Sequence, residues 1–501
     1  MRPVVLIHTL GMTRSDASAS ERLETGIPGM DEILCGGLRK RSATLLRGAP
    51  GAGKTIFGLH FLAAGVQASE TGLYVNLGEP VDYIRETAAT FGLDVEPVNF
   101  LSLSATGEEF HSDETYDLFS SAEVEGPSLV ENIREEIEAV DPDRVVIDPA
   151  TEFRYLTTDE HQFRSQILSL LDFLKAAEAT VVLTSQAADS MPDDDLQFLV
   201  DAVVTIDSDG KRRTVEIPKF RGSSTRSGRH TVTITDSGMH AWPQIDPARH
   251  ERSRTLSTRP SGVAALDALL SGGLTTGTVT FVSGPTGVGK TTTGLQFLTE
   301  AASNGDRSVL YSFEEDTETL LTRAEAIGIP VGKLIDSGQL HIEEIGPDEL
   351  TVDEFTSRIR TEVEDNDTEL VMIDGTTGFE QSLVGVGENP TGPLVRIGRY
   401  LRNMGVTGII TNEVHQITGE FRATEQKVSH LADAIVVLRH VEHRGQLRKV
   451  IGVLKKRTSE YEPRLRELEI TAEGIRVGEP LSELRGILTG TPEWNDADDE
   501  Q

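Results

Sequence analysis

Short apolar runs alternate with amphipathic stretches along most of this chain. In the first half, runs rich in β-branched and aliphatic residues predict strands over Ser42–Arg47, Gly72–Leu77, Arg144–Ile147 and Thr180–Thr184. Apolar residues at helical spacing between these runs predict helices over Thr55–Ala68 and Ser128–Ala139. Because strands that alternate with helices form a parallel sheet covered on both faces, we expect an α/β fold.

The same pattern occurs a second time further along the chain. Landmark residues recur with one constant offset of 236 positions (290 − 54 for the lysines). The pairs are Gly26 and Gly262, Gly36 and Gly272, Lys54 and Lys290, Glu79 and Glu315, Lys219 and Lys455, and Arg221 and Arg457. Six landmark pairs with one offset, which extend from Gly26 to Arg221 in the first copy, indicate two tandem copies of one domain. Each copy closes with β-like alternation, at Thr231–Thr235 and at Leu468–Thr471, which predicts a closing antiparallel hairpin.

The repeat divides the chain into five parts. These are a disordered or mis-annotated N-terminal lead (1–19), a first domain (20–245), a polar linker (246–260), a second domain (261–485) and an acidic C-terminal tail (486–501). Only the middle of the repeat drifts, since Asp148 and Asp374 differ by 226 positions. We place the extra residues of the first copy in the polar stretch 104–128.

Each copy carries a phosphate-binding motif of the form G-x-x-x-x-G-K-[ST], directly after a predicted strand and at the start of a predicted helix. Its residues are Gly48, Ala49, Pro50, Gly51, Ala52, Gly53, Lys54 and Thr55 in the first copy, and Gly284, Pro285, Thr286, Gly287, Val288, Gly289, Lys290 and Thr291 in the second. Glycines let backbone N–H groups converge on the phosphates, and the helix directs its positive end at them. Both copies are therefore predicted to bind ATP, with the lysine on the β- and γ-phosphates and the threonine on Mg²⁺.

Carboxylates follow two further strands of each copy. Asp148 and Asp374 end buried runs and are predicted to support Mg²⁺ together with the P-loop threonines. Glu314 and Glu315 follow another strand of the second copy, where a carboxylate can accept a proton from an attacking water or hydroxyl. The first copy keeps only Glu79, because glycine occupies position 78. The alternative for these glutamates is that they are ordinary surface acids of a very acidic protein.

The composition narrows the classes of protein that fit. The chain has 501 residues, 37% of them hydrophobic and 26% charged, which suffices for sizeable cores. No apolar run approaches the roughly 18 residues of a membrane-spanning helix. A single cysteine, Cys35, excludes an internal disulfide framework and is compatible with a reducing cytoplasm, so we expect a cytoplasmic protein. The net charge of −34, with only 11 lysines, resembles halophilic proteomes and weighs against nonspecific DNA binding.

Taken together, these residues resemble the KaiC family, the double-domain clock ATPases, and more closely the KaiC-like proteins of archaea. The resemblance extends from about Arg22 to Thr491 and rests on the tandem P-loops, the doubled Gly-Gly-Leu entry and the Glu-Glu strand end. It implies two RecA-like P-loop domains in a two-tiered hexamer, with ATP and Mg²⁺ bound between subunits. In such a ring, the basic pairs of each copy would reach the nucleotide of the neighbouring subunit. These pairs are Lys219 with Arg221 and Lys455 with Arg457.

The resemblance also implies autophosphorylation of the second domain. The family segment that carries adjacent serine and threonine acceptors resembles residues 424–433, where Ser429 falls on the serine and His430 replaces the neighbouring threonine. Ser429 is therefore a candidate phosphorylation site, whereas the two-step cycle of the clock protein is not expected. Compared with the family's C-terminal peptide, residues 486–501 are short, so we do not expect a partner-capturing tail there, and we expect their acidic end to be disordered.

The leading prediction is an ATPase with serine/threonine autokinase activity that acts as a signalling switch or timer with unknown signalling proteins. The first alternative is a RecA/RadA-type ATPase that acts on DNA, which shares the fold. It would require basic pore loops or a helix-hairpin-helix module, and the sequence shows neither. The second alternative is a scaffold whose assembly is controlled by ATP, which the glycine at position 78 favours.

Overall fold

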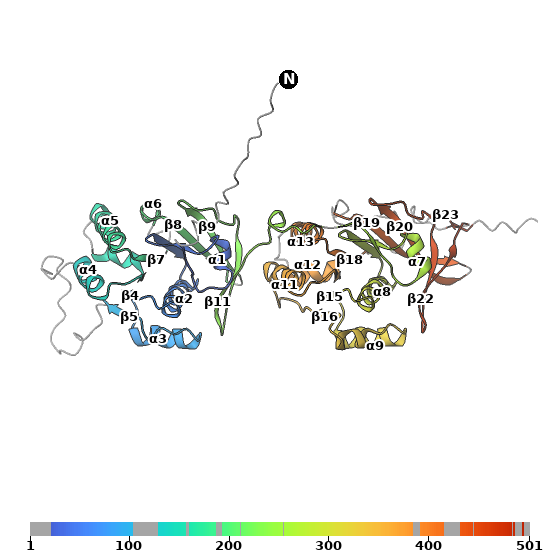
Figure 1. Cartoon of the computed structure of the whole chain (residues 1–501), viewed down its shortest axis with the longest axis horizontal. Coiled ribbons are helices and arrows are strands. Elements are labelled where there is room, and N and C mark those ends of the chain that lie inside the picture. Colours follow the sequence, from blue (N-terminus) through green and yellow to red (C-terminus); the bar gives the residue numbers. More distant parts are fainter. Residues whose placement is uncertain are drawn as a thin grey trace, which may run out of the picture. The chain divides into compact units, whose positions relative to one another are not determined.

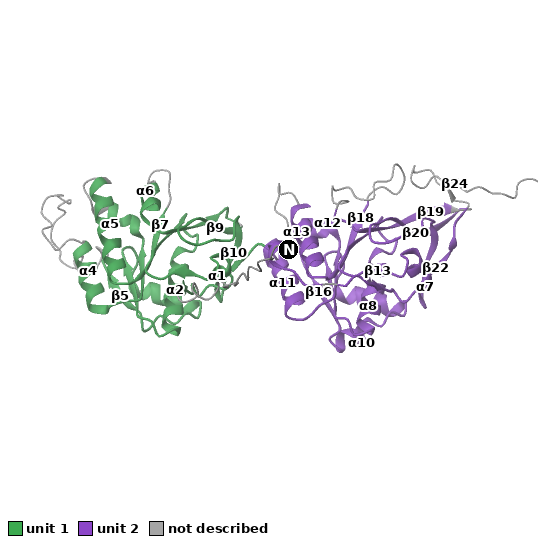
Figure 2. Ribbon diagram, turned by 45° about the horizontal axis from the view of Figure 1, so that its top comes forward, with its two compact units in different colours: residues 1–244 green, residues 245–501 purple. Residues whose placement is uncertain are grey.

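In the computed structural model, the chain divides into two compact units, Met1–Gln244 and Ile245–Gln501, each described here by itself (Figure 2). The structure describes residues 22–103, 129–156, 160–186, 193–210, 212–253, 255–383, 391–414, 431–443, 445–482, 484–485 and 493–494.

Unit 1 is built on a mixed sheet of nine described strands in the order β5-β4-β6-β7-β3-β8-β9-β10-β11 (Figure 1). The six strands from β5 to β8 are parallel, and β9, β10 and β11 continue the sheet in antiparallel pairing. In sheet order the bounds are Asn99–Ser102, Gly72–Asn76, Arg144–Asp148, Thr180–Gln186, Ala43–Gly48, Ala202–Ser208, Arg213–Phe220, His230–Thr235 and Gly238–Trp242. A short ladder of β1 (Arg22–Leu23) and β2 (Leu38–Arg39) precedes the central strand β3.

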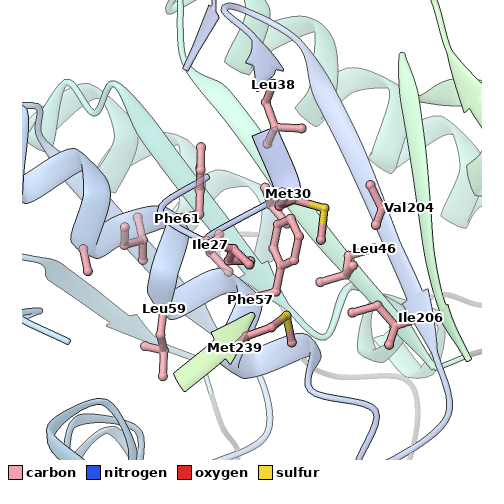
Figure 3. Packing of buried hydrophobic residues seen from close by; sticks show 14 of the residues in the cluster. Ile27, Met30, Leu38, Leu46, Phe57, Leu59, Phe61, Val204, Ile206 and Met239 are labelled. Carbon is pink, nitrogen blue, oxygen red and sulfur yellow. The ribbon is translucent and has the colours of Figure 1, made fainter. Parts of the chain in front are cut away.

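Helices cover both faces of this sheet because successive strand residues point to opposite sides. Leu46 of β3 packs with Phe57 and Phe61 of α2, while its neighbour Leu45 belongs to a separate cluster with α4 and α5. Figure 3 shows the α2 side, where Phe57 lies among Met30, Leu46 and Met239. The helices are α1 (Met30–Ile33), α2 (Lys54–Gln67), α3 (Val81–Thr90), α4 (Leu129–Val140), α5 (Glu160–Ala176) and α6 (Asp194–Leu199), with a 3₁₀ helix, η3, at Ala150–Leu156.

Unit 2 repeats this topology strand for strand, in the order β16-β15-β17-β18-β14-β19-β20-β21-β22. In sheet order the bounds are Leu340–Glu344, Ser308–Ser312, Leu370–Asp374, Thr407–Glu413, Val279–Gly284, Ala434–His443, Gln446–Lys456, Arg466–Thr471 and Gly474–Pro480. The short strands are β12 (Thr258–Arg259), β13 (Leu274–Thr275), β23 (Leu484–Arg485) and β24 (Glu493–Trp494). The helices are α7 (Ala264–Leu269), α8 (Lys290–Ser303), α9 (Thr317–Ala326), α10 (Val331–Asp336), α11 (Val352–Glu364), α12 (Thr376–Leu383) and α13 (Thr391–Asn403).

The predicted α/β fold is confirmed: each unit has a mainly parallel sheet flanked by helices. The predicted strands and helices agree with the observed ones to within one or two residues, as at β3 and α2. The extra residues that we placed at 104–128 lie outside the described part of the chain. Among the helices that are described, none combines the length and apolar composition needed to cross a membrane.

The start of the segment predicted as a linker, 246–260, packs on unit 2. The 3₁₀ helix η4 (Pro247–Arg249) contacts α13, since Asn403 Nδ2 donates to Pro247 O at 2.7 Å. The Arg252 N–H donates to Asn403 O at 3.0 Å. His250 Nδ1 lies 2.7 Å from Glu364 Oε1 on α11. These contacts tie residues 247–252 to the second unit, although their composition is polar.

Candidate nucleotide sites

Each P-loop connects the central strand of a unit, β3 or β14, to a largely buried helix, α2 or α8, at the carboxyl end of the parallel strands. Backbone geometry explains two of the glycines in each loop. Gly53 and Gly289 precede the helices with φ of 104° and 110°, in the left-handed region that favours glycine. A Cβ at Gly48 would lie 2.6 Å from Ile206 O, and one at Gly284 would lie 2.5 Å from Leu438 O. Both loops therefore pass so close to the neighbouring strand that only glycine fits.

Both P-loop lysines are buried and fold back over their own loops. Lys54 Nζ donates to Gly48 O at 2.9 Å and to Ala49 O at 3.1 Å, and Lys290 Nζ donates to Pro285 O at 3.1 Å. Burial lowers the pKa of Lys54, while the charge of Asp148 acts in the opposite direction. Each ammonium group thus lies where the loop and the helix N-terminus converge, which is the arrangement that binds phosphate.

Asp148 of β6 lies at the centre of a hydrogen-bond cluster beside the first P-loop. Thr55 Oγ1 and the Tyr74 hydroxyl each donate to Asp148 Oδ2 at 2.7 Å, and the Thr184 hydroxyl donates to Oδ1. The sequence brings these groups together because β4, β6 and β7 are neighbouring parallel strands that end at one edge. Burial and the charge of Asp148 raise the pKa of Tyr74 far above its usual value, so its hydroxyl stays a donor.

Asp374 of β17 occupies the corresponding place beside the second P-loop. Thr411 Oγ1 donates to Asp374 Oδ1 at 2.7 Å, whereas the buried Oδ2 has no hydrogen-bond partner among the described residues. Burial raises the pKa of this carboxyl, and the nearby hydroxyls of Thr411 and Thr291 partly offset that effect. A buried carboxylate oxygen without a donor, close to the P-loop, fits a divalent cation held by oxygen ligands. The residues of the second site thus suit Mg²⁺.

The turns after β4 in unit 1 and after β15 in unit 2 are both held by a polar side chain at the end of the strand. Asn76 Oδ1 accepts from the backbone N–H groups of Gly78 at 3.2 Å and Glu79 at 3.1 Å. In unit 2, Ser312 Oγ donates to Glu315 O at 2.6 Å. A polar side chain that bonds the backbone two or three residues ahead fixes such turns. The carboxylates that follow the strand are therefore carried on a defined backbone.

Glu314 lies over Gly375, the residue after Asp374. Gly375 has φ of 104°, and a Cβ there would come within 2.6 Å of Glu314 Cγ. The Glu314 side chain is exposed, as that of Glu79 is, but its surroundings displace part of its hydration water, which raises its pKa. The charges of Asp374 and Glu413 raise this pKa further, while Lys290 lowers it. This carboxylate therefore lies within the electrostatic field of the P-loop lysine and of the predicted metal ligand.

The corresponding place in unit 1 holds no carboxylate. A Cβ added at Gly78 would lie 3.7 Å from Pro149 Cδ, so glycine and proline stand where the second unit has Glu314 and Gly375. Glu79 follows, exposed on the surface, and its pKa is raised by partial burial and by the charge of Asp148. The two sites consequently share their phosphate-binding parts and differ in the group that could accept a proton.

The sequence analysis missed Glu413, a third carboxylate at the second site. The Thr286 hydroxyl of the P-loop donates to Glu413 Oε1, and Glu413 pairs with Gly284 across the β14–β18 ladder. Gln186 holds the corresponding position at the end of β7, opposite Gly48. Glu413 could have been identified from the sequence by its position at the carboxyl end of a predicted parallel strand, because ligands bind at that edge of such sheets.

The basic pairs lie near the opposite edge of the sheets. Lys219 pairs with Val203, near the start of β8, whereas the P-loop follows the far end of β3. Lys219 Nζ donates to Gln197 O at 2.6 Å and to Val200 O at 2.7 Å, at the end of α6. Arg221 Nη2 donates to Phe198 O at 3.3 Å.

The second unit repeats this placement. Lys455 pairs with Ile435 at the start of β19, and Arg457 Nη1 lies 3.9 Å from Asp433 Oδ1. Strand register thus separates each basic pair from the P-loop of its own unit. Ser429 lies outside the described residues.

Comparison with known proteins gives a consistent result. The family model described as "ATPase: KaiC" matches the chain twice, at residues 23–245 and 259–482. The chain is 26% identical over 496 residues to "Circadian clock protein KaiC3" of Synechocystis sp., covering 96% of each chain. It is 29% identical over 486 residues to "Circadian clock oscillator protein KaiC" of Prochlorococcus marinus, covering 94% of this chain and 95% of that protein. The protein of the same name from Synechococcus elongatus is 28% identical over 491 residues, with coverage of 95% and 93%.

Proposed function

The chain belongs to the KaiC family of ATPases and is an ATP-binding P-loop ATPase of RecA-like fold, and from this premise we propose a division of labour between its domains. Both domains bind ATP with Mg²⁺. The second domain also transfers the γ-phosphoryl group to a serine or threonine hydroxyl of the protein itself, with Ser429 as the candidate acceptor. The first domain mainly holds ATP and supports assembly.

The phosphate-binding residues of the two domains correspond to each other, so each domain can bind one ATP in the same way. Loop N–H groups and the helix N-terminus bind the phosphates, and Lys54 or Lys290 neutralises their β and γ oxygens. Thr55 with Asp148, and Thr291 with Asp374, would hold Mg²⁺, which when bound neutralises charge on the phosphates.

Glu314 is the single observation that carries the asymmetry. In the transfer, the acceptor oxygen attacks the γ-phosphorus while the bond from that phosphorus to the β–γ bridging oxygen breaks. The hydroxyl proton passes to the Glu314 carboxylate, leaving a phosphoserine and ADP. The raised pKa of Glu314 makes its carboxylate a better proton acceptor than an ordinary glutamate. Hydrolysis follows the same scheme with water as the attacking group. In the first domain Gly78 offers no such group, and Glu79, the next residue, is the candidate in its place.

A ring with ATP between subunits, of which a hexamer is the form that we propose, would give the basic pairs a role. Lys219 lies near the amino end of the parallel strands, away from the P-loop of its own unit, and we propose that its ammonium group serves a nucleotide on a neighbouring subunit. A cation supplied in trans stabilises charge on the transferred phosphoryl group and makes turnover depend on assembly. The same argument applies to Lys455 and Arg457. Such a ring would act as a switch or timer, in keeping with the clock names of its relatives.

Gly78 also favours a second candidate, a scaffold whose ATP sites control assembly. Mass spectrometry of the full chain separates the two. The protein is incubated with Mg²⁺ and ATP in molar KCl, and occupancy of both sites is shown by counting bound nucleotides. Phosphate on Ser429, abolished in the Ser429→Ala variant, supports the autokinase. Full nucleotide occupancy without any phosphorylated residue would contradict it and favour the scaffold.

A further inference from the structure

We propose that Arg323 and Glu315 form an ion-pair clamp that positions Glu314, so that Arg323 is a positioning residue for the chemistry of the second domain. The proposal rests on the proposed role of Glu314 as proton acceptor. It assigns the two adjacent glutamates different tasks, which the sequence alone leaves equivalent.

The clamp joins the exit of β15 to the helix that follows. Arg323 Nη2 on α9 lies 2.6 Å from Glu315 Oε2. The backbone of Glu315 is fixed from the other side, because Ser312 Oγ donates to its carbonyl at 2.6 Å. The next residue, Asp316, caps α9 by accepting from Thr319 N at 2.8 Å. Three separate contacts thus fix the residues directly after Glu314.

The side chains of the two glutamates point toward different partners. Glu314 packs over Gly375 and lies in the field of Lys290, whereas Glu315 is bound by Arg323. The charged groups facing Glu315 are Arg323, Asp374 and Asp316. A carboxylate that holds an arginine is poorly placed to accept a proton near the phosphates. The geometry therefore favours Glu314 as the catalytic residue and Glu315 as part of its support.

The first domain serves as a natural comparison. Its counterpart of Glu315 is Glu79, and Thr87 stands 236 positions before Arg323. The Thr87 hydroxyl donates to Tyr83 O at 2.8 Å within its own helix. No ion pair to Glu79 occurs among the residues that the structure describes in this unit. The clamp and the carboxylate it would position are thus present together in one domain and absent together from the other.

The typical stability of an ion pair and the typical rate cost of a misplaced group predict which measurements the clamp would change. An ion pair between half-exposed side chains contributes little to stability, typically below about 1 kcal/mol. Positioning has larger consequences for rate, since a displacement of about 1 Å in a reacting group can cost on the order of a hundredfold. Loss of the clamp should therefore lower kcat while leaving the melting temperature and the KM for ATP nearly unchanged.

A charge reversal tests the clamp. Glu315→Arg, Arg323→Glu and the double variant are compared in otherwise unchanged full-length protein. The turnover of Lys290→Ala protein, which keeps the first site, is subtracted so that the remainder reports the second domain. We expect each single reversal to lower kcat for ATP about tenfold, with KM changed less than about twofold, and the double variant to recover most of the loss. Arg476→Glu on β22, which breaks an exposed pair with Glu473 in the turn before that strand, is the control and should leave kcat unchanged.

Arg323→Thr, which installs the first-domain residue, and Arg323→Lys extend the test if a reversed pair fails to fold. The lysine variant should retain more activity than the threonine variant. Unchanged kcat in Arg323→Thr would overturn the proposal. A folded double variant that is as inactive as Glu315→Arg alone would also overturn the proposal, because Glu315 would then be needed as a catalytic residue and not only as the partner of Arg323. Full activity in Glu314→Gln is a different failure, since it would remove the proposed proton acceptor rather than the clamp.

Discussion

The two domains have the same strand order and similar phosphate-binding sequences, yet they differ in residues that follow the neighbouring strands. Gly78 and Pro149 in the first domain stand where the second has Glu314 and Gly375. The P-loop lysines and their loop contacts, by contrast, are present in both. The two copies thus share the P-loop residues, which depend on backbone geometry, and differ in the side chains beside them.

The hydrogen bonds around Asp148 and Asp374 show a second difference. Tyr74 reaches Asp148 from β4, whereas leucine fills the corresponding position in β15. The tyrosine of β15, Tyr311, is one residue further along and therefore faces the other side of its sheet, where it packs edge-on against Phe355. The first aspartate is consequently held by three hydroxyl groups, while the second keeps one buried oxygen without a donor among the described residues.

The largest effect is expected from removing the carboxylate found only in the second domain. Glu314→Gln keeps the size of the side chain but cannot accept a proton, so phosphoryl transfer should fall by about 10²–10⁴. The measurement is single-turnover ATP consumption and protein labelling. Glu318→Gln on the exposed face of α9 is the matched control. If Glu314→Gln and Glu318→Gln transferred phosphoryl groups at comparable rates, the proposed difference between the two domains would be contradicted.

Gly375→Ala should have the next largest effect. Its Cβ would collide with Glu314 Cγ, and a φ of 104° disfavours any residue with a side chain. We expect roughly a tenfold loss of kcat in the second domain. In a Glu314→Gly background the same substitution should cost kcat little more, because the displaced group is already gone. Equal losses in both backgrounds would show that Gly375 acts through the backbone alone.

The two buried tyrosines give a stability comparison. Tyr74→Phe removes a donor from Asp148 and should destabilise the first domain by about 1–3 kcal/mol, measured by calorimetry in molar KCl. Tyr311→Phe removes a buried hydroxyl that has no partner among the described residues, so its change should stay within about 0.5 kcal/mol. A larger loss for Tyr311→Phe than for Tyr74→Phe would contradict this account of the first site.

The smallest effect concerns pH. Glu314 must be ionised to accept a proton, and its pKa is raised by the loss of part of its hydration water and by the charges of Asp374 and Glu413. The rate should therefore fall with decreasing pH at a value above the usual range for glutamate. Glu413→Gln removes one of the raising charges, which lowers the pKa of Glu314 and moves this acid limb to lower pH. A shift to higher pH would show that Glu413 acts on another group.

Much of the fold could be predicted because the strongest signals are local. The glycine-rich P-loop motif after an apolar run predicts β3 and α2, and the constant offset of the repeat predicts β14 and α8 in the second unit. Asp148 and Asp374 were identifiable since each ends a buried apolar run. These features depend on neighbours in sequence, or on a repeat that can be seen in sequence.

Other features depend on which distant side chains meet, and sequence patterns do not record this. Glu413 is one acid among many in a chain of net charge −34, and only the β14–β18 ladder brings it to Thr286. In the sequence, nothing distinguishes Arg323 from other basic residues on the exposed face of a helix. Residues 247–252 are polar, as in a linker, but they bond to Asn403 of the second unit. Tertiary contacts of this kind follow from the fold rather than from local composition.

The most direct test is to measure where the γ-phosphate goes. Wild-type, Lys54→Ala and Lys290→Ala proteins are incubated with Mg²⁺ and γ-labelled ATP in molar KCl, and free phosphate and protein-bound label are counted. The account predicts protein-bound label in wild type and in Lys54→Ala, provided that Lys54→Ala still assembles, and none in Lys290→Ala. Label that persists in Lys290→Ala, or that is absent from a fully assembled wild-type protein turning over ATP, would contradict the assignment of phosphoryl transfer to the second domain.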